Sequence, residues 1–152
     1  MVDIRVANAE SDALILAEHN CAMALETENK LLDLEVAILG VNGLFERSEF
    51  GFYLVAEVNG TVAASLMVTY EWSDWRNGLF WWIQSVYVKP QFRRQGLYRG
   101  MYEQLKTMAL DQETPVCGFR LYAETDNVGA HATYVDSGMH VCEYLMFEEE
   151  TA

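Results

Sequence analysis

The dipeptide Asn59-Gly60 separates two apolar runs and is the feature that most limits how this chain can fold. Residues 50–58 precede it and residues 61–70 follow it, and both runs are rich in aromatic and β-branched side chains. Asn-Gly accepts the positive φ of a two-residue turn, so this pattern predicts an antiparallel hairpin. A similar turn signal, Arg76-Asn77-Gly78, follows shortly afterwards. We therefore expect a run of antiparallel strands in the middle of the chain.

Helices are predicted on both sides of these strands. Apolar residues recur at three- and four-residue steps over 11–26, 33–46 and 97–111, which is typical of helices that pack on a sheet. A shorter helix is expected over 127–137, closed by Gly138. Alternating apolar residues and turn signals predict further strands at 2–6, 66–75, 79–88, 118–123 and 139–147.

The bulk composition points to one globular domain with an acidic surface. The chain has 152 residues, 51% of them hydrophobic, and shows no repeat or linker, so we expect a single domain over 1–152. The formal net charge of -13 argues against a nucleic-acid partner and against an anionic membrane. A cationic substrate fits this charge better, although the same charge also serves solubility.

Cysteines and hydropathy indicate the compartment. Cys21, Cys117 and Cys142 are odd in number and lack metal-ligand spacing, so neither a disulfide framework nor a metal site is predicted. No apolar stretch is long enough to span a bilayer, and the first residues lack the pattern of a signal peptide. We expect a soluble, cytoplasmic protein.

A basic loop stands between a predicted strand and the helix over 97–111. Arg93, Arg94 and Arg99 place three of the ten basic residues within seven positions, and Gly96 lets an anion approach the backbone. The first turn of a helix carries unpaired N–H groups and a partial positive charge, which favours phosphate binding. A solvated basic helix start would have the same composition.

Two spaced motifs carry a family pattern. Arg93, Gly96 and Tyr98 fall on the positions Arg or Gln, Gly, and Gly or Ala of the first motif, with Tyr98 larger than the usual residue. The block over 127–139 matches the second, Asn, two residues, Ala, three residues, Tyr, three residues, Gly, then Phe or Met. Together they resemble the GNAT superfamily of acetyl-CoA-dependent N-acetyltransferases, whose cofactor motif is the first. The resemblance implies an α+β GNAT fold: a central, mixed, mostly antiparallel β-sheet flanked by about four helices.

The resemblance also implies a donor site for acetyl-CoA, without a metal. Tyr134 matches the tyrosine that protonates the departing thiolate, and we expect cofactor binding to tolerate the larger Tyr98 with its ring turned outward. The implied cofactor contacts are Val86, Tyr87 and Val88 for the pantetheine arm, Arg93, Arg94, Gln95, Gly96, Leu97, Tyr98 and Arg99 for the pyrophosphate, and Asn127.

The group that deprotonates the amine remains open. Many relatives place a glutamate where Gln84 and Ser85 stand, and neither residue is a base at neutral pH. The base is therefore a water held by Gln84 or Ser85, or a carboxylate from elsewhere. Because the junction of the first two helices and the second hairpin border the acceptor cleft in this fold, the candidates for that carboxylate, and for binding the amine, are Glu26, Glu28, Glu71 and Asp74. The backbone N–H of Val86 is the candidate donor to the oxyanion.

The acceptor is predicted to be a small cationic amine resembling a diamine or polyamine. Residues 70–82 hold all four tryptophans beside two carboxylates, which suits an organic cation. The same aromatic run also suits core packing or a dimer interface, and we expect a homodimer. The alternatives are a peptide, protein or drug amine as acceptor, a non-catalytic module that senses acetyl-CoA, and a structural domain without a cofactor.

Overall fold

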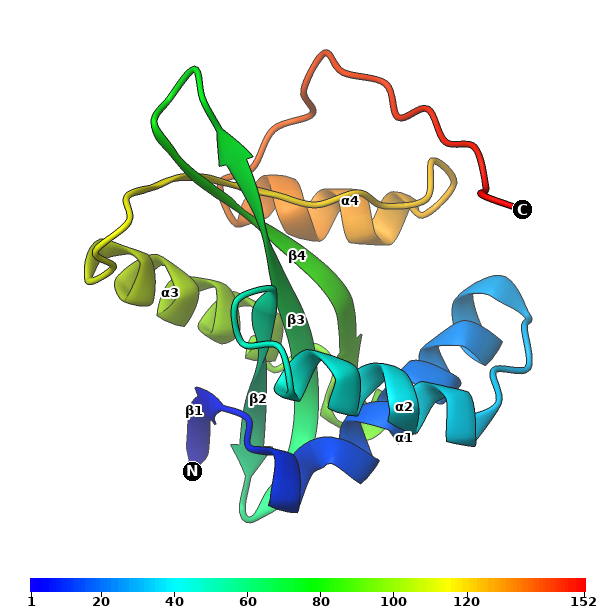
Figure 1. Ribbon diagram of the computed structural model, residues 1–152. Coiled ribbons are helices and arrows are strands. Elements are labelled where there is room, and N and C mark those ends of the chain that lie inside the picture. The colour runs from blue at the N-terminus through cyan, green and yellow to red at the C-terminus, as the bar shows by residue number, and fades with distance from the viewer. The chain divides into compact units, whose positions relative to one another are not determined.

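The computed structural model describes all 152 residues, which form two compact units, 1–122 and 123–152. The first unit contains a five-stranded sheet with three α-helices, and the second contains one helix and the C-terminal segment (Figure 1). In chain order the elements are β1 (Val2–Val6), α1 (Ala9–Glu28), α2 (Leu34–Phe45), β2 (Gly51–Val58), β3 (Thr61–Ser73), β4 (Gly78–Val88), the 3₁₀-helix η1 (Pro90–Phe92), α3 (Leu97–Leu110), β5 (Val116–Arg120) and α4 (Val128–Asp136).

The sheet has the strand order β1-β2-β3-β4-β5. The first four strands are antiparallel to their neighbours, whereas β5 runs parallel to β4. The predicted hairpin is confirmed, because Val58 pairs with Thr61 and both turn residues have positive φ, 50° at Asn59 and 83° at Gly60. A mixed, mostly antiparallel sheet with four α-helices confirms the expected α+β class.

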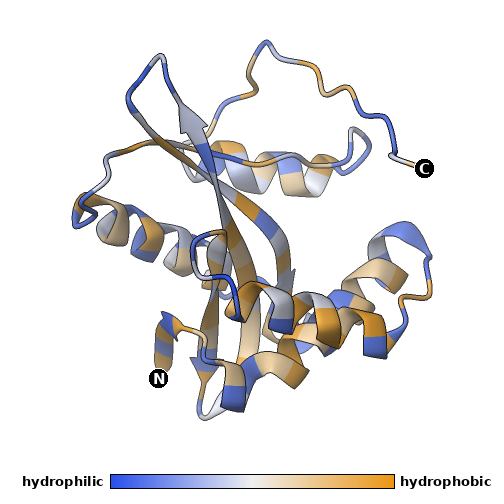
Figure 2. Ribbon diagram, viewed as in Figure 1, coloured by the Kyte–Doolittle hydropathy of each residue, from blue (hydrophilic) through white to orange (hydrophobic).

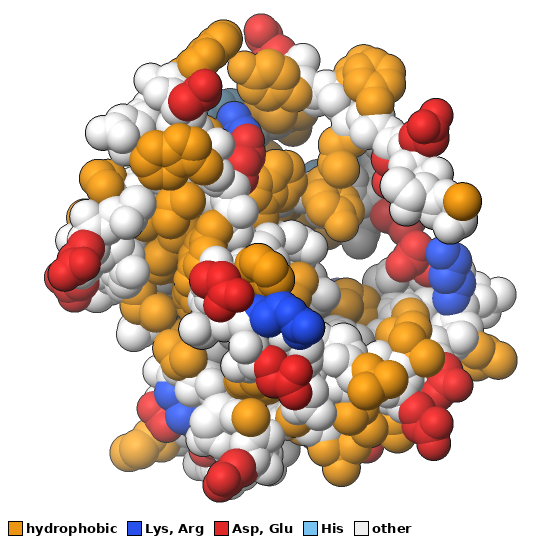
Figure 3. Space-filling view, viewed as in Figure 1, with side chains coloured by type: hydrophobic (Ala, Val, Ile, Leu, Met, Phe, Trp, Pro, Cys, Tyr) orange, Lys and Arg blue, Asp and Glu red, His pale blue; other side chains and the backbone are white.

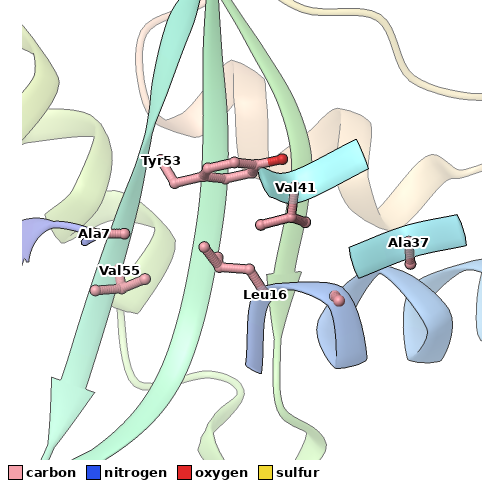
Figure 4. Packing of buried hydrophobic residues seen from close by; sticks show 7 residues of the cluster. Ala7, Leu16, Ala37, Val41, Tyr53 and Val55 are labelled. Atoms are coloured by element: carbon pink, nitrogen blue, oxygen red, sulfur yellow. The ribbon is translucent and has the colours of Figure 1, made fainter. Parts of the chain in front are cut away.

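The two faces of the sheet are covered by different helices. Tyr53 and Val55 of β2 pack against Leu16 of α1 and Val41 of α2 (Figure 4). On the opposite face the ring of Tyr102 in α3 meets Phe119 edge-on, with a centroid separation of 5.5 Å. The sheet is therefore buried on both sides over its central part, and only its ends and edges remain for binding.

Helix α2 is largely hydrophobic (Figure 2). Ala37 and Val41 are buried, whereas Leu39 is 72% exposed and Leu34 is 41% exposed. None of the helices combines the length and the apolar character that crossing a membrane requires.

Arg5 joins three elements of the first unit. Its guanidinium forms a bidentate ion pair with Asp12 in α1, at 2.7 and 3.0 Å, and it also contacts Glu57 in β2. The Asp12 side chain is almost fully buried, and hydrogen bonding from Arg5 lowers the pKa of its carboxyl group. The arginine therefore supplies the charge that makes this burial tolerable.

The strand predicted over 139–147 is wrong. This segment forms no strand, and its apolar side chains are exposed, with Val141 at 88% and Phe147 at 89%. Alternation in a sequence sets which side chains would share a face, but a strand also needs a neighbour for its backbone hydrogen bonds. None of the five strands pairs with this segment. Strand β5 also begins two residues before the predicted position and ends at Arg120.

Candidate functional site

Strand β4 has an outer edge that is paired over only part of its length. Residues Leu79 to Trp82 pair with β5, but no strand pairs with that edge from Ile83 to Val88. An unpaired strand edge offers backbone N–H and C=O groups to an extended ligand. This stretch contains Val86, Tyr87 and Val88, the residues predicted to bind a pantetheine arm.

A bulge interrupts β4 within the same stretch. Met67 pairs with Gln84 and Ser65 pairs with Tyr87, so that Ser85 and Val86 together stand opposite one residue of β3. Ser85 adopts a positive φ of 52°, which is uncommon for a residue with a side chain. Because the bulge shifts the alternation by one, Gln84 and Tyr87 face the same side of the sheet, the side that carries α1.

The loop after β4 has the backbone of an anion site. Arg94 and Gly96 both have positive φ, 64° and 76°, which makes the tight turn in which backbone N–H groups can converge on an anion. Gly96 is the N-cap of α3, and the first helical bond runs from the N–H of Gly100 to the oxygen of Gly96. A Cβ built on Gly96 would meet nothing within 4 Å, so the approach to this turn is open. The loop therefore fits a pyrophosphate.

Tyr98 does not point outward, so that prediction was wrong. Its side chain is 8% exposed and stacks on Tyr102, with a centroid separation of 6.0 Å and an interplanar angle of 8°. Together with Leu97 and Met101 it belongs to the buried side of α3. The bulky ring therefore packs inside the protein, and only the backbone of Tyr98 belongs to the open helix start.

Arg93 contacts α1 as well as the end of β4. Its Nε donates to the carbonyl oxygen of Val88 at 2.8 Å, and its two terminal nitrogens lie 2.7 and 2.9 Å from the two carboxylate oxygens of Glu26. The guanidinium also lies 5.6 Å from the ring centroid of Tyr87. Hydrogen bonding from Arg93 lowers the pKa of Glu26. A residue predicted to bind the cofactor and one predicted to bind the acceptor are thus partners.

Polar side chains between the bulge and the turn that joins β3 to β4 form a second cluster. Glu71 accepts hydrogen bonds at one oxygen, Oε1, from Nε1 of Trp82 at 2.8 Å and from Arg120 at 2.9 Å. Gln84 donates to Thr69 Oγ1 at 2.6 Å. Register places this cluster on the same face as Met67, which packs against the core under α1 and α2. The cluster thus presents a carboxylate, an indole and a guanidinium beside the bulge.

Arg120, Trp82 and Thr69 were not among the predicted site residues. The Arg120 guanidinium lies 3.6 Å from the centroid of Phe80, in addition to its ion pair with Glu71. A lone arginine within the apolar run 116–121 is the sequence signal that could have marked it.

The other two predicted acids do not join either cluster. Glu28 is exposed at the end of α1, 3.8 Å from Lys30, and Asp74 is exposed in the turn between β3 and β4. The structure contains no group of three or more His, Cys, Asp or Glu side chains that could hold a metal ion. A hollow of about 390 Å³ near the end of α3, lined in part by Tyr70 and Glu113, contains none of the predicted site residues.

The second unit carries the other motif. The side chain of Asn127 caps α4 by accepting a hydrogen bond from the N–H of Ala130 at 3.1 Å. Burial raises the pKa of the Tyr134 phenol above its ordinary value, so this hydroxyl stays protonated at neutral pH. A protonated phenol is suited to donate a proton to a basic thiolate.

Acidic side chains are spread over the face of the molecule shown in Figure 3, with only a few Lys and Arg side chains among them. Hydrophobic side chains also gather on this face over α1 and α2. The surface therefore agrees with the excess of 23 acidic over 10 basic residues. The loop after β4, with Arg93, Arg94 and Arg99 in or beside it, is a local exception because its charge is positive.

Comparisons with known proteins show the family of this chain. The model of the acetyltransferase (GNAT) family matches residues 15–139. A possible acetyltransferase from Clostridium difficile 630 is 41% identical, with 100% of this chain and 99% of that chain covered and a TM-score of 0.91. No curated protein matches the sequence.

Two more distant structures share the fold. A predicted acetyltransferase from Clostridium acetobutylicum, solved with acetyl-CoA, is 18% identical over 97% of this chain and 96% of that chain, with a TM-score of 0.76. The structure of AAC(6')-Iy with the bisubstrate analog CoA-S-monomethyl-acetylneamine is 12% identical over 100% of this chain and 99% of that chain, with a TM-score of 0.75.

Proposed function

The chain belongs to the GNAT family of acetyltransferases and depends on acetyl-CoA, and we propose that it acetylates the primary amine of a small cationic molecule of the diamine or polyamine kind. The transfer is direct: the amine attacks the acetyl carbonyl while both substrates are bound. The observation that supports this most is the unpaired edge of β4 leading into the open turn at Gly96.

Acetyl-CoA supplies the acetyl group as a thioester. The edge of Val86, Tyr87 and Val88 is proposed to pair with its pantetheine arm. The proposed pyrophosphate contacts are the backbone of 94–99 and the exposed side chain of Arg94. We assign a supporting role to Arg93, because its guanidinium is already held by Glu26 and Val88. Asn127 is retained as a proposed contact near the cofactor.

The proton steps are assigned to residues whose chemistry suits them. The amine must lose a proton before or during attack, and a water held beside Gln84 and Ser85 would accept it, since Gln84 is fixed by Thr69. The N–H of Val86, in the bulge, is proposed to stabilise the oxyanion. Tyr134 gives its proton to the thiolate as the C–S bond breaks, and burial, which raises the pKa of the phenol, keeps it protonated until then.

The choice of a cationic acceptor is supported by the acidic surface and by the cluster around Glu71. A carboxylate beside the Trp82 indole suits an ammonium group. Arg120 neutralises part of this charge, so a second candidate is an amine whose neighbouring anionic group would approach Arg120. Peptide, protein and drug amines remain alternative acceptors of the same reaction.

Release of free CoA thiol tests the function. The purified protein and acetyl-CoA would be incubated with diamines, amino acids, aminoglycosides and short peptides, one class at a time. Turnover with diamines above all other classes is expected. If CoA binds but no amine in the panel is acetylated, the protein is instead a sensor of acetyl-CoA. A preference for amino acids would favour the candidate that uses Arg120.

We propose that residues 1–152 act as one catalytic domain, since the family match runs from residue 15 to residue 139 across both units. Exposed apolar side chains such as Leu39 support a homodimer. Three free cysteines support a cytoplasmic location.

A further inference from the structure

Helix α1 contacts both the end of β4 and the loop that follows it. The ring of His19 lies 5.0 Å from that of Tyr87, and Glu26 pairs with Arg93, five residues after the end of β4. His19 and Glu26 are seven residues apart, so they lie two turns from each other on the same side of the helix. One face of α1 therefore borders both the strand and the loop of the donor site.

The Arg93 guanidinium is held at three nitrogen atoms. Nε donates to the oxygen of Val88, the last residue of β4, and the two terminal nitrogens reach both oxygens of Glu26. The first contact closes the turn that contains η1, and the second fixes this turn to another element. Both carboxylate oxygens of Glu26 are used in this pair, which removes the charge that a cationic acceptor would seek.

We propose that Glu26 is a positioning residue for the donor site: through Arg93 it holds the pyrophosphate loop in its binding conformation and has no part in binding the acceptor amine. The loop that follows Arg93 has positive φ at Arg94 and at Gly96. Glycine adopts this φ readily, but at Arg94, which carries a side chain, it persists only where the surroundings hold it. The inference rests on the proposed function only in that the loop binds CoA.

Calorimetric titration with CoA is the direct test. Glu26→Gln removes the charge and keeps the shape, and we expect it to weaken CoA binding about three- to fivefold, the size typical of a partly exposed ion pair. Glu18→Gln is the matched control, because Glu18 is exposed on the same helix, and its dissociation constant should equal that of the wild type. In an Arg93→Ala background, Glu26→Gln should cause no further loss.

A donor without pyrophosphate provides the second readout. With S-acetylpantetheine in place of acetyl-CoA, Glu26→Gln should leave kcat/KM unchanged, whereas with acetyl-CoA it should raise KM and spare kcat. Unchanged CoA affinity with a raised KM for the amine would return Glu26 to the acceptor site and overturn the proposal. Additive losses in the double variant would also overturn it. If no amine is acetylated, the proposed function fails, but the CoA titrations still decide the role of Glu26.

Discussion

Nδ1 of His19 lies 2.7 Å from Oγ of Ser65, and this contact joins α1 to β3 inside the protein. The histidine is 2% exposed, and its Nε2 is buried without a hydrogen-bond partner. Burial, with a smaller effect from the charge of Lys89, lowers the pKa of His19 to about 4 from an ordinary value of 6.5. Between these two pH values the His19 ring is therefore neutral in the folded protein but protonated in the unfolded chain.

Stability should fall in mildly acidic solution because of His19. When the pH is above 6.5, His19 is neutral in both the folded and the unfolded chain and does not change stability. As the pH falls from 6.5 towards 4, His19 binds a proton in the unfolded chain but not in the folded protein, and stability falls. At about pH 5 this amounts to about 2 kcal/mol of the free energy of unfolding. Urea titrations at pH 7 and 5 would measure it. His19→Gln should lose this pH dependence, and the exposed control His140→Gln should keep it. An equal change in the free energy of unfolding between pH 7 and pH 5 in the wild type and both variants would contradict the assignment.

Tyr134→Phe should lower kcat roughly 100-fold, the size typical of losing a general acid. The affinity for acetyl-CoA should change little, because only the hydroxyl is removed. Steady-state kinetics and CoA titration separate the two quantities. Tyr144→Phe, at a side chain that is 70% exposed, should keep the wild-type kcat. Full kcat in the Tyr134→Phe variant would show that another group, or water, protonates the thiolate.

Glu71→Gln should raise KM for a diamine about fivefold, because the change removes the negative charge that would attract the ammonium group and that offsets the charge of Arg120. The new amide oxygen can still accept the hydrogen bond from Trp82. Asp74→Asn makes the same change in charge in the exposed turn and should have a smaller effect. Identical KM values for wild type and both variants would count against a cationic acceptor.

Gly96→Ala should weaken CoA binding about fivefold, because alanine disfavours the positive-φ turn by roughly 1 kcal/mol, so the free loop relaxes and CoA must restore the turn. Gly60 is a matched control, because its φ of 83° is close to the 76° of Gly96 and an added Cβ is unobstructed at both. Gly60→Ala should lower the melting temperature without affecting the CoA dissociation constant. Equal effects of both changes on CoA binding would argue against the loop as the pyrophosphate site.

Arg5→Ala should lower the free energy of unfolding by about 2–3 kcal/mol, because it leaves the buried Asp12 carboxylate without a counter-charge. Arg47→Ala removes an exposed arginine whose pair with Glu46 is 4.0 Å long, and it should cost less than about 0.5 kcal/mol. Chemical denaturation of both variants measures the difference. A small loss for Arg5→Ala would mean that Asp12 finds water or another partner.

Local signals predicted the parts of the fold that local chemistry decides. Asn59-Gly60 marked a real turn because positive φ is a property of those two residues. The predicted strand over 139–147 failed because a strand depends on a neighbour that alternation cannot identify. The direction of Tyr98 was misjudged for a similar reason: Tyr98 lies on the buried side of α3 with Met101 and Leu105, and tertiary packing sets that side, not the motif.

The donor site was predictable as a segment but not as a set of partners. Spacing located Arg93 and Gly96, whereas the pairing of Arg93 with Glu26, 67 positions earlier, exists only once α1 lies beside the end of β4. Arg120 and Glu71 are likewise 49 positions apart. Charge at a residue can be read from a sequence, but neutralisation by a distant partner cannot.

The bulge at Ser85 makes the length of β4 as important as its composition. Two residues opposite one shift the phase of the strand, so Gln84 and Tyr87 share a face although an uninterrupted strand would place them on opposite faces. Removing one residue between them would send Tyr87 away from His19 and rotate the start of the cofactor loop with it. Natural variants of this protein should therefore keep the number of residues between Gln84 and Tyr87.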